Sequence, residues 1–465
     1  MAARAPAVPG GPARPRAGLP AQAPDRADPP APEDRRAMTD TGRRTRRIDS
    51  PCNDTESYPT VARAIAAARG LARRHPGRCR VREVGRSRAG RPLVLLSVDD
   101  GEHTVLVVGG PHPNEPVGLA AAVRLAEQAL AQPPRPGVGW HVLLCLDPDG
   151  AALNEGWLNG PLTAARHYEH FFRPAFHEQP ELLPHPDGPL APMPESRALT
   201  GLIDELRPVL QCSLHGVDFG GAFVQLTRPL PALAGRFARS AARGGIPLDV
   251  DSYDALGWAS PAPGTYLMPP PGRSRQPLPD RPELSTWAYA GRHGGTTAVL
   301  EVPMWAVDAV GDHRPAPDVA AAMAACADRL RSRVAALTAL LPQVPTHAGV
   351  AYGPLLRSVE FNLAVCPPVV DDWLANWSTA ALSVSRVTTA RIVAERVPLR
   401  IAAMLLRLLA DSGGPAADAA RARARGVAAA SLEGLQRLGA RWVPVETQVA
   451  HQTRAVLAAA DLLLP

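Results

Sequence analysis

The chain has 465 residues, and 46% of them are hydrophobic, so it is long and apolar enough to bury a large core. Its formal charge of +6 arises mainly in residues 1–48, where ten Arg stand against five acidic residues. The other residues are close to neutral, so the basic excess belongs to this tail, which argues against a nucleic-acid-binding domain with a basic face. Every residue counted as Lys or Arg is Arg, which indicates a compositional bias and not a function of arginine.

Cysteine spacing and hydropathy indicate the cellular location of the protein. The six Cys are scattered without a CxxC pair, and Cys145 and Cys212 lie in apolar runs, so we expect reduced thiols. No run of 18 apolar residues and no stretch of signal-peptide type is present, which predicts no membrane-spanning helix and a cytoplasmic location. The sequence indicates no nucleic acid and no membrane among its partners, and no protein partner is identifiable.

Composition divides the chain into four parts. Residues 1–48 are rich in Pro and Arg without periodicity, which predicts a disordered leader; translation from Met38 is the alternative. Residues 49–312 alternate predicted strands and helices, which is typical of an α/β domain with a mixed sheet flanked by helices. A connecting helix over 313–344 and an all-helical extension of unknown role over 345–465 follow.

The predicted elements follow from apolar periodicity and from turn residues. In the α/β part we expect helices over 61–74, 116–131, 195–206 and 230–243, and strands over 79–84, 93–98, 104–108, 140–146, 209–214, 222–227 and 297–302. Strand signals then stop, and we expect helices over 319–341, 351–364, 371–384, 388–409, 416–438 and 446–464. The Arg and Ala stripes in 388–438 are interpreted as a solvated helix face, with a membrane-surface helix as the alternative.

Polar side chains follow three buried strands. His112 and Glu115 come after the strand at 104–108, His215 follows a second strand, and Glu301 lies near the end of a third. Ligands of open α/β sheets bind at the carboxyl ends of strands. Two His and one carboxylate can hold Zn²⁺ with a fourth position open for water, and a free carboxylate such as Glu301 can act as general base. An HxxE match alone is expected by chance in a chain of this length. The prediction therefore depends on the position of these residues at the ends of buried strands.

Further motifs accompany these residues in a defined order. They are V-G-R-S-x-x-G-R-P-L at 84–93, the strand and HxxE at 107–118, D-P-D-G at 147–150, L-H-G at 214–216 and S-x-W-x-Y at 285–289. This series resembles the zinc carboxypeptidase family (M14 metallopeptidases) over about 55–312. The resemblance implies a zinc-carboxypeptidase-like fold and one Zn²⁺ per chain, held by His112, Glu115 and His215. It also implies that Glu301 deprotonates the attacking water and passes the proton to the leaving amine of a peptide or N-acyl amino acid substrate.

The substrate-binding residues depart from the family. The family binds the terminal carboxylate with an Asn-Arg pair, and this chain has no such dipeptide. Arg173 and Arg166 are the available guanidiniums, and a surface or structural role is the alternative for both. Asn154 is a further candidate, with a turn residue as its alternative. Tyr266 is a displaced candidate for the family's substrate-closing Tyr, with core packing as the alternative.

Two rival functions remain open. An amidase or deacylase of the aspartoacylase and succinylglutamate-desuccinylase type, acting on a small N-acyl amino acid, has a similar zinc motif, and P-N-E-P at 113–116 fits it. The long connection from Glu115 to His215 favours the carboxypeptidase branch. The second rival is a non-catalytic binding module that retains the fold, and the presence of all four site residues argues against it.

Overall fold

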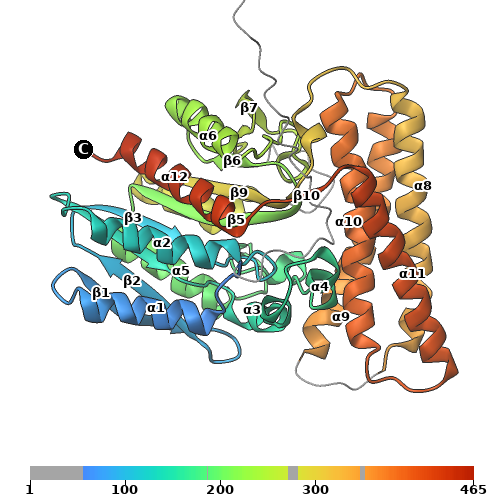
Figure 1. The fold of residues 1–465 in the computed structure, drawn as a ribbon, viewed down its shortest axis with the longest axis horizontal. Helices are drawn as coiled ribbons and strands as arrows, with labels where there is room; N and C mark the ends of the chain where they lie inside the picture. Colours follow the sequence, from blue (N-terminus) through green and yellow to red (C-terminus); the bar gives the residue numbers. More distant parts are fainter. Residues whose placement is uncertain (1–55, 186, 271–280, 346–350) are drawn as a thin grey trace, which may run out of the picture. The chain divides into compact units, whose positions relative to one another are not determined.

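A mixed β-sheet flanked by helices, with a helical region in the C-terminal part of the chain, makes up the fold, as the sequence predicts (Figure 1). The computed structural model describes residues 56–185, 187–270, 281–345 and 351–465. The predicted leader at 1–48 lies outside these residues.

The sheet that the described residues form has ten strands. Their spatial order is β1-β2-β4-β3-β5-β9-β6-β8-β7, and β10 pairs with β9. The pairs β3/β4, β3/β5, β5/β9 and β6/β8 are parallel, and the other neighbours are antiparallel. The strands are β1 (Cys79–Arg86), β2 (Pro92–Val98), β3 (His103–Val108), β4 (Val138–Leu143), β5 (Leu210–Gly220), β6 (Phe223–Leu226), β7 (Ala259–Ala262), β8 (Thr265–Leu267), β9 (Thr296–Ala306) and β10 (Arg441–Trp442).

Strand β3 shows how the sequence builds the core on both faces of the sheet. Val105 and Val107 point to one face and pack in the larger core cluster, whereas Leu106 and Val108 point to the other. All four are completely buried, because successive side chains of a strand alternate between faces and helices cover both. This accounts for the continuous apolar run in the sequence.

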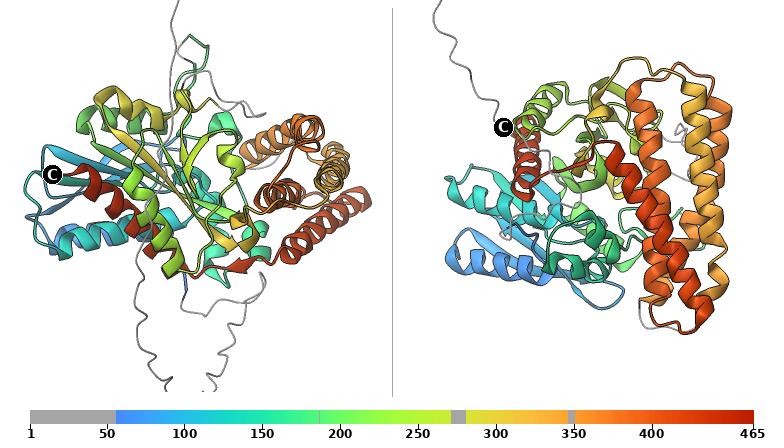
Figure 2. Two further views of the ribbon diagram at one scale, coloured as in Figure 1. Left: turned by 90° about the horizontal axis from the view of Figure 1, so that it is seen from above. Right: turned by 45° about the vertical axis from the view of Figure 1, so that its right-hand side comes forward.

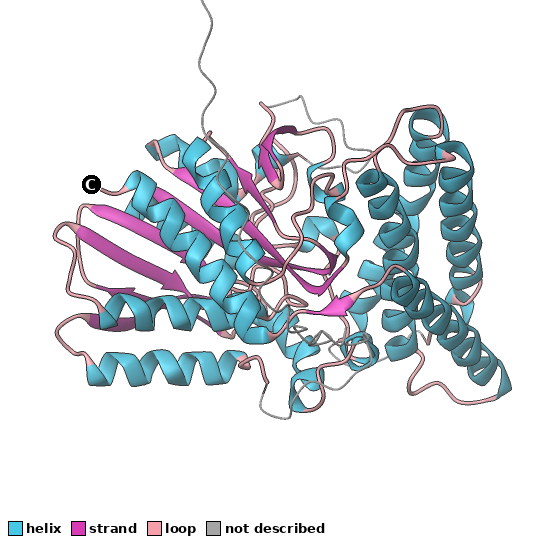
Figure 3. Ribbon diagram, turned by 45° about the horizontal axis from the view of Figure 1, so that its top comes forward, coloured by secondary structure: helices cyan, strands magenta, loops and turns pink. Residues whose placement is uncertain are grey.

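Helices pack on both faces of the sheet (Figure 3). One face carries α1 (Val61–Arg74), α2 (Val117–Ala131), α6 (Pro231–Arg243) and α12 (Val445–Leu463), and the other carries α5 (Pro194–Leu206). Shorter helices connect the strands: α3 (Pro148–Asn154), α4 (Ala164–Glu169) and α7 (Thr286–Tyr289). Helix α1 begins after Thr60, which caps it: the side-chain hydroxyl of Thr60 accepts a hydrogen bond from the backbone N–H of Arg63.

The helical region stands beside one end of the sheet (Figures 1 and 2). It consists of α8 (Val319–Thr338), α9 (Tyr352–Asp372), α10 (Val384–Leu408) and α11 (Pro415–Arg437), with α10 in contact with the other three. The prediction of a separate helix over 371–384 is wrong. Helix α9 continues through two prolines to Asp372 and ends in a π-helical turn at Trp373–Trp377, and the buried Val369 and Val370 anchor this last part. Helix α10 begins only after Ser383, whose hydroxyl accepts from the N–H of Arg386.

The solvated face predicted for 388–438 is wrong for α10. Glu395 and Arg396 are 2% and 9% exposed, because α10 packs against three helices and also contacts α4 and β5. Glu395 forms ion pairs with Arg329 and Arg333 of α8. Two other arginines of α10 differ in exposure: Arg391 is exposed, whereas the side chain of Arg400 is 13% exposed.

The division of the chain at residues 313 and 345 stays a prediction. In the structure, α8 packs with α9, α10 and α11, whereas α12 lies on the sheet against α2, α6 and β9. A strand that the sequence did not indicate, β10, pairs with Trp305 and Ala306. The five cysteines within the described ranges are free and buried. None of the described helices combines the length and apolarity that crossing a membrane requires.

Candidate metal centre

The loop after β3 meets the middle of β5 and β9 at one point of the sheet. His215 and Glu301 lie inside these two strands, which continue to Gly220 and Ala306, so the prediction that the strands end at 214 and 302 is wrong. After β3 the chain turns at Gly110, whose φ of +53° suits glycine, and this turn delivers His112 and Glu115 just before α2. Gly118 lets α2 approach β5, because a Cβ atom there would lie 2.7 Å from the carbonyl oxygen of Leu214. This close approach brings Glu115 beside His215.

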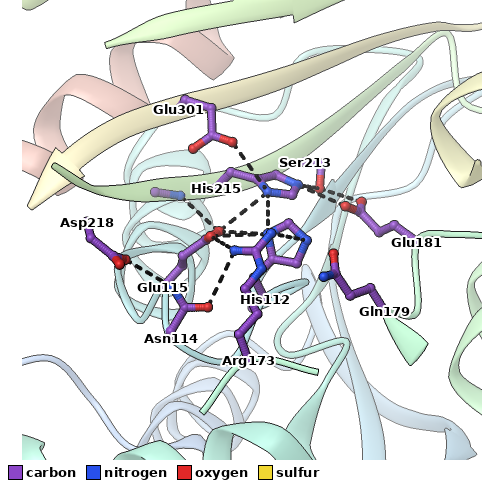
Figure 4. A network of polar contacts seen from close by, with 12 residues as sticks. His112, Asn114, Glu115, Arg173, Gln179, Glu181, Ser213, His215, Asp218 and Glu301 are labelled. Carbon is purple, nitrogen blue, oxygen red and sulfur yellow. Dashed lines mark hydrogen bonds and ion pairs between the residues drawn. The ribbon is translucent and has the colours of Figure 1, made fainter. Parts of the chain in front are cut away.

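The donor atoms of His112, Glu115 and His215 converge (Figure 4). The Nδ1 atoms of the two histidines are 3.0 Å apart, and Oε2 of Glu115 lies 3.0 Å from the first and 3.4 Å from the second. Ligand atoms at about 2.1 Å from a tetrahedral Zn²⁺ are roughly 3.4 Å from one another. The three side chains are buried and their separations are close to this value, so the cluster fits a zinc ion.

The second ring nitrogen of His215 also fits a metal ligand. Its Nε2 lies 2.8 Å from Oε2 of Glu181, and Ser213 donates a hydrogen bond of 2.6 Å to the other oxygen of Glu181. A carboxylate at Nε2 keeps the proton there and leaves the Nδ1 lone pair free, as is usual for metal-binding His. Nothing in the sequence indicates Glu181, because it lies in an irregular segment without motif or periodicity.

Glu301 faces the cluster from the neighbouring strand. In the parallel pair β5/β9 it lies in register with His215, and its Oε1 is 3.6 Å from Nδ1 of His215. Its Oε2 is buried and has no hydrogen-bond partner among the described residues. Burial raises the pKa of Glu301 well above its usual range, and the charge of Glu115 adds to this, whereas His215 opposes it. Such a carboxyl group can both accept and return a proton.

The charges of the cluster depend on each other. Burial and the nearby Arg173 lower the pKa of His112 to about 4, so its imidazole is neutral, as a metal ligand requires. Burial alone would raise the pKa of Glu115, but His112 and Arg173 bring it well below its usual range. Glu115 is therefore a carboxylate, and its Oε2 also accepts from the backbone N–H of Gly216 at 3.1 Å.

Of the four predicted substrate-binding residues, Arg173 contacts the cluster. Its Nη1 donates to Oε1 of Glu115 at 2.6 Å, and its Nη2 lies 3.2 Å from Nε2 of His112. Asn154 holds the preceding residue instead: its side chain bonds both the N–H and the carbonyl oxygen of Phe172, at 3.0 and 2.8 Å. Asn154 is thus placed to position Arg173.

The structure does not bring Arg166 and Tyr266 to the cluster. Arg166 donates to the carbonyl oxygen of Gly156 at 3.3 Å. The hydroxyl of Tyr266 donates to the carbonyl oxygen of Asp249 and accepts from the N–H of Ser252, both at 2.9 Å. Neither residue lines the cavity at the metal centre.

A buried hub at Asp218 joins the cluster to the helical region. Its Oδ2 accepts from Arg400 of α10 at 2.7 Å and from the hydroxyl of Tyr168 at 2.7 Å, and its Oδ1 accepts from Asn114 at 3.1 Å. Burial would raise the pKa of Asp218, but Arg400 and other cations lower it to about 2. Since Asn114 lies between His112 and Glu115 in the chain, Arg400 braces the HxxE loop through Asp218.

A cavity of about 210 Å³ opens at the metal centre. The sheet side contributes the three residues of the cluster, Glu301 and Arg173, and the other side belongs to the helical region. Residues of α8, α9 and α10 in this wall are mostly apolar; they are Leu330, Phe361, Asn362, Val365, Cys366, Val369, Val393, Arg396, Val397 and Arg400. The helical region thus forms part of the site, which the sequence did not show.

Comparisons with known proteins show what this chain is similar to. Among solved structures, the chain is similar to carboxypeptidase A from Helicoverpa armigera (16% identity over 53% of this chain and 65% of that chain, TM-score 0.35). It is also similar to a metallo-carboxypeptidase from Burkholderia cenocepacia (18% identity over 55% of this chain and 61% of that chain, TM-score 0.31). A third similar structure is bovine thrombin-activatable fibrinolysis inhibitor (12% identity over 52% of this chain and 86% of that chain, TM-score 0.33). The chain thus spans less than two thirds of the length of the first two.

No curated protein matches the chain. Residues 64–173, which include His112 and Glu115, match the family model described as zinc carboxypeptidase. This match confirms the resemblance to the zinc carboxypeptidase (M14) family that the motifs predict.

Proposed function

We propose that this chain is a zinc-dependent hydrolase that cleaves an amide bond adjacent to a free carboxylate. The observation that carries the proposal is the convergence of His112, Glu115 and His215, with Glu301 facing them at 3.6 Å from His215. A non-catalytic binding module would not need a buried carboxyl group with a free oxygen beside a potential metal site.

His112, Glu115 and His215 would hold one Zn²⁺, which when bound supplies Lewis-acid polarisation of the scissile carbonyl and of the attacking water. Glu301 removes a proton from that water and delivers it to the leaving amine. The raised pKa of Glu301, caused by burial first, lets the group hold the proton between these steps.

Arg173 is the candidate for the carbonyl oxygen of the substrate. When Nδ1 of His112 is a ligand, the ring proton lies on Nε2, and this nitrogen can no longer accept from Nη2 of Arg173. The N–H group at Nη2 of Arg173 is then free to donate to the substrate oxygen as negative charge develops on it. Preorganised donors stabilise charge of this kind.

The cavity favours a small substrate. A volume of about 210 Å³ with helices on one side suits an N-acyl amino acid or the last residues of a peptide. The amidase or deacylase function on a small N-acyl amino acid therefore remains the second candidate.

Elemental analysis of the purified protein and of His215→Ala tests the metal site. We expect about one zinc per chain in the wild type and its loss in the variant. Glu301→Gln should keep the zinc and lose roughly 10²–10⁴-fold in hydrolysis of carboxylate-bearing amides. A wild type that takes up no zinc would remove this mechanism and favour the binding module, and full activity in Glu301→Gln would refute the assignment of the base.

A further inference from the structure

Arg396 of α10 is a buried cation in the wall of the cavity. Its side chain lines the same cavity as His112 and His215, and the residue is 9% exposed. Its Nε atom has no hydrogen-bond partner, and none of the hydrogen bonds or ion pairs found within the described ranges involves its guanidinium. A buried arginine without a counterion is rare, because the loss of hydration is not compensated.

Glu395, the neighbour of Arg396 in the chain, and Asp218, whose charge it senses, both pair with other arginines. Glu395 pairs with Arg329 and Arg333. Asp218 accepts two hydrogen bonds from Arg400, at 2.9 and 2.7 Å, and further bonds from Tyr168 and Asn114. Arg396 therefore lies in the field of Asp218 but beyond ion-pair distance, and its own positive charge remains for a ligand.

Apolar residues line the cavity wall beside Arg396, together with Arg400. Val393 and Val397 lie on the same side of α10, and Val365 and Val369 of α9 line the same cavity. An anion that enters this wall is bound away from bulk water, where a charge-assisted hydrogen bond is strong. An aliphatic or aromatic group beside the anion would cover the valines.

We propose that Arg396 binds the free carboxylate of the substrate, and that the valines of α9 and α10 receive an apolar side chain next to that carboxylate. The inference rests on the proposed function for the identity of the anion. A planar guanidinium can donate two parallel hydrogen bonds to a carboxylate. This role of Arg396 places substrate recognition in the helical region, opposite the zinc-binding residues. Arg396 would then be the carboxylate-binding group that Arg166 is not.

Binding of N-acetyl-L-leucine and N-acetyl-L-phenylalanine to the zinc-loaded full-length protein tests the proposal. Calorimetry is done in the Glu301→Gln background, which separates binding from turnover, and each acid is compared with its carboxamide. Adding Arg396→Gln should weaken binding of an acid roughly 10–100-fold and leave the carboxamide unchanged. The affinity of Arg396→Lys for an acid should lie between those of the parent and of Arg396→Gln. Arg391→Gln, the same change on the exposed side of α10, is the matched control and should have no effect.

Stability gives a second readout. Because Arg396 pairs with none of the residues that the structure describes, Arg396→Gln without ligand should unfold at the same temperature as its parent or at a higher one. A clear decrease would mean that Arg396 is paired in the folded protein and would overturn the proposal.

Equal binding of acids and carboxamides by the parent, or an unchanged affinity after Arg396→Gln, would also overturn the proposal. If zinc and hydrolysis are present but binding does not depend on Arg396, only this inference fails. If carboxylate binding depends on Arg396 in a protein without hydrolytic activity, the proposed function fails and the carboxylate site remains.

Discussion

Replacing Glu181 should weaken zinc binding while leaving the fold intact. Glu181 contacts Nε2 of His215 at 2.8 Å and the hydroxyl of Ser213 at 2.6 Å, and it is 1% exposed. Its carboxylate fixes the proton on Nε2 and orients the ring, so that Nδ1 faces His112 and Glu115. Without it, His215 can adopt the other tautomer or turn its ring, and both changes remove the Nδ1 lone pair from the site.

The size of the effect follows from the kind of contact that is lost. Residues that orient a metal-binding His typically account for 10–100-fold in metal affinity, which is about 1.4–2.7 kcal/mol. Glu181→Ala removes the charge and the hydrogen bond, so we expect the upper end of this range. Glu181→Gln keeps an oxygen that accepts from Nε2 and loses only the charge, so the lower end is expected.

Competition against a chelator of known zinc affinity measures this loss, with the variant of an exposed residue, Glu169→Gln, as control.

The pH dependence of the loss in zinc affinity adds a check. Burial alone would lower the pKa of His215, but Glu181 and other carboxylates raise it well above its usual range, so a proton competes with zinc in the wild type. Removing Glu181 weakens that competition, and the measured loss should be larger at pH 8 than at pH 6.5. An affinity of Glu181→Ala within twofold of the wild type at pH 8 would refute the role given to Glu181.

Two further variants test the electrostatics of the interior. Asp218→Asn leaves Arg400 buried without its counterion and should lower the free energy of unfolding in urea by about 3–5 kcal/mol, whereas the exposed Asp308→Asn should cost less than about 1 kcal/mol. Equal losses would mean that the Asp218 pair is not buried in solution. Burial raises the pKa of Asp147 from 3.8 to about 7, so its contribution to stability is complete below pH 3.8 and is lost as the pH rises through 7. Asp147→Asn should therefore gain roughly 2–3 kcal/mol relative to the wild type between pH 5 and pH 8, and a constant difference would contradict this pKa.

Sequence alone predicts the part of the site that local patterns encode. His112 and Glu115 lie three residues apart in one loop. His215 follows one apolar run and Glu301 lies near the end of another, and both runs predict buried strands. Parallel strands place their carboxyl ends at one edge of a sheet, so four residues far apart in the chain are expected together. The structure brings these four together, with His215 and Glu301 in register.

What the sequence did not show depends on contacts between distant segments. Glu181 becomes a partner of His215 only through the path of an irregular segment. Arg396 and Arg400 were indistinguishable from other arginines of an Arg-rich chain, because the periodicity of a helix gives its faces and not their neighbours. Asn154 was expected at a substrate and instead bonds the backbone of Phe172, a choice that side-chain type does not decide.

The contacts of α12 lead to a prediction for a chain truncated after residue 344. This helix packs on α2, α6 and β9, and the side chain of Gln452 donates to the carbonyl oxygens of His215 and Leu300. Truncation would also leave Asp218 buried without Arg400. We therefore expect the shortened chain to lose cooperative thermal unfolding and zinc binding, both measured beside the full-length protein. Zinc affinity equal to that of the full-length chain would show that the sheet builds the metal centre without the helices that brace it, and the contacts of Arg400 and Gln452 would then serve the substrate side of the cavity alone.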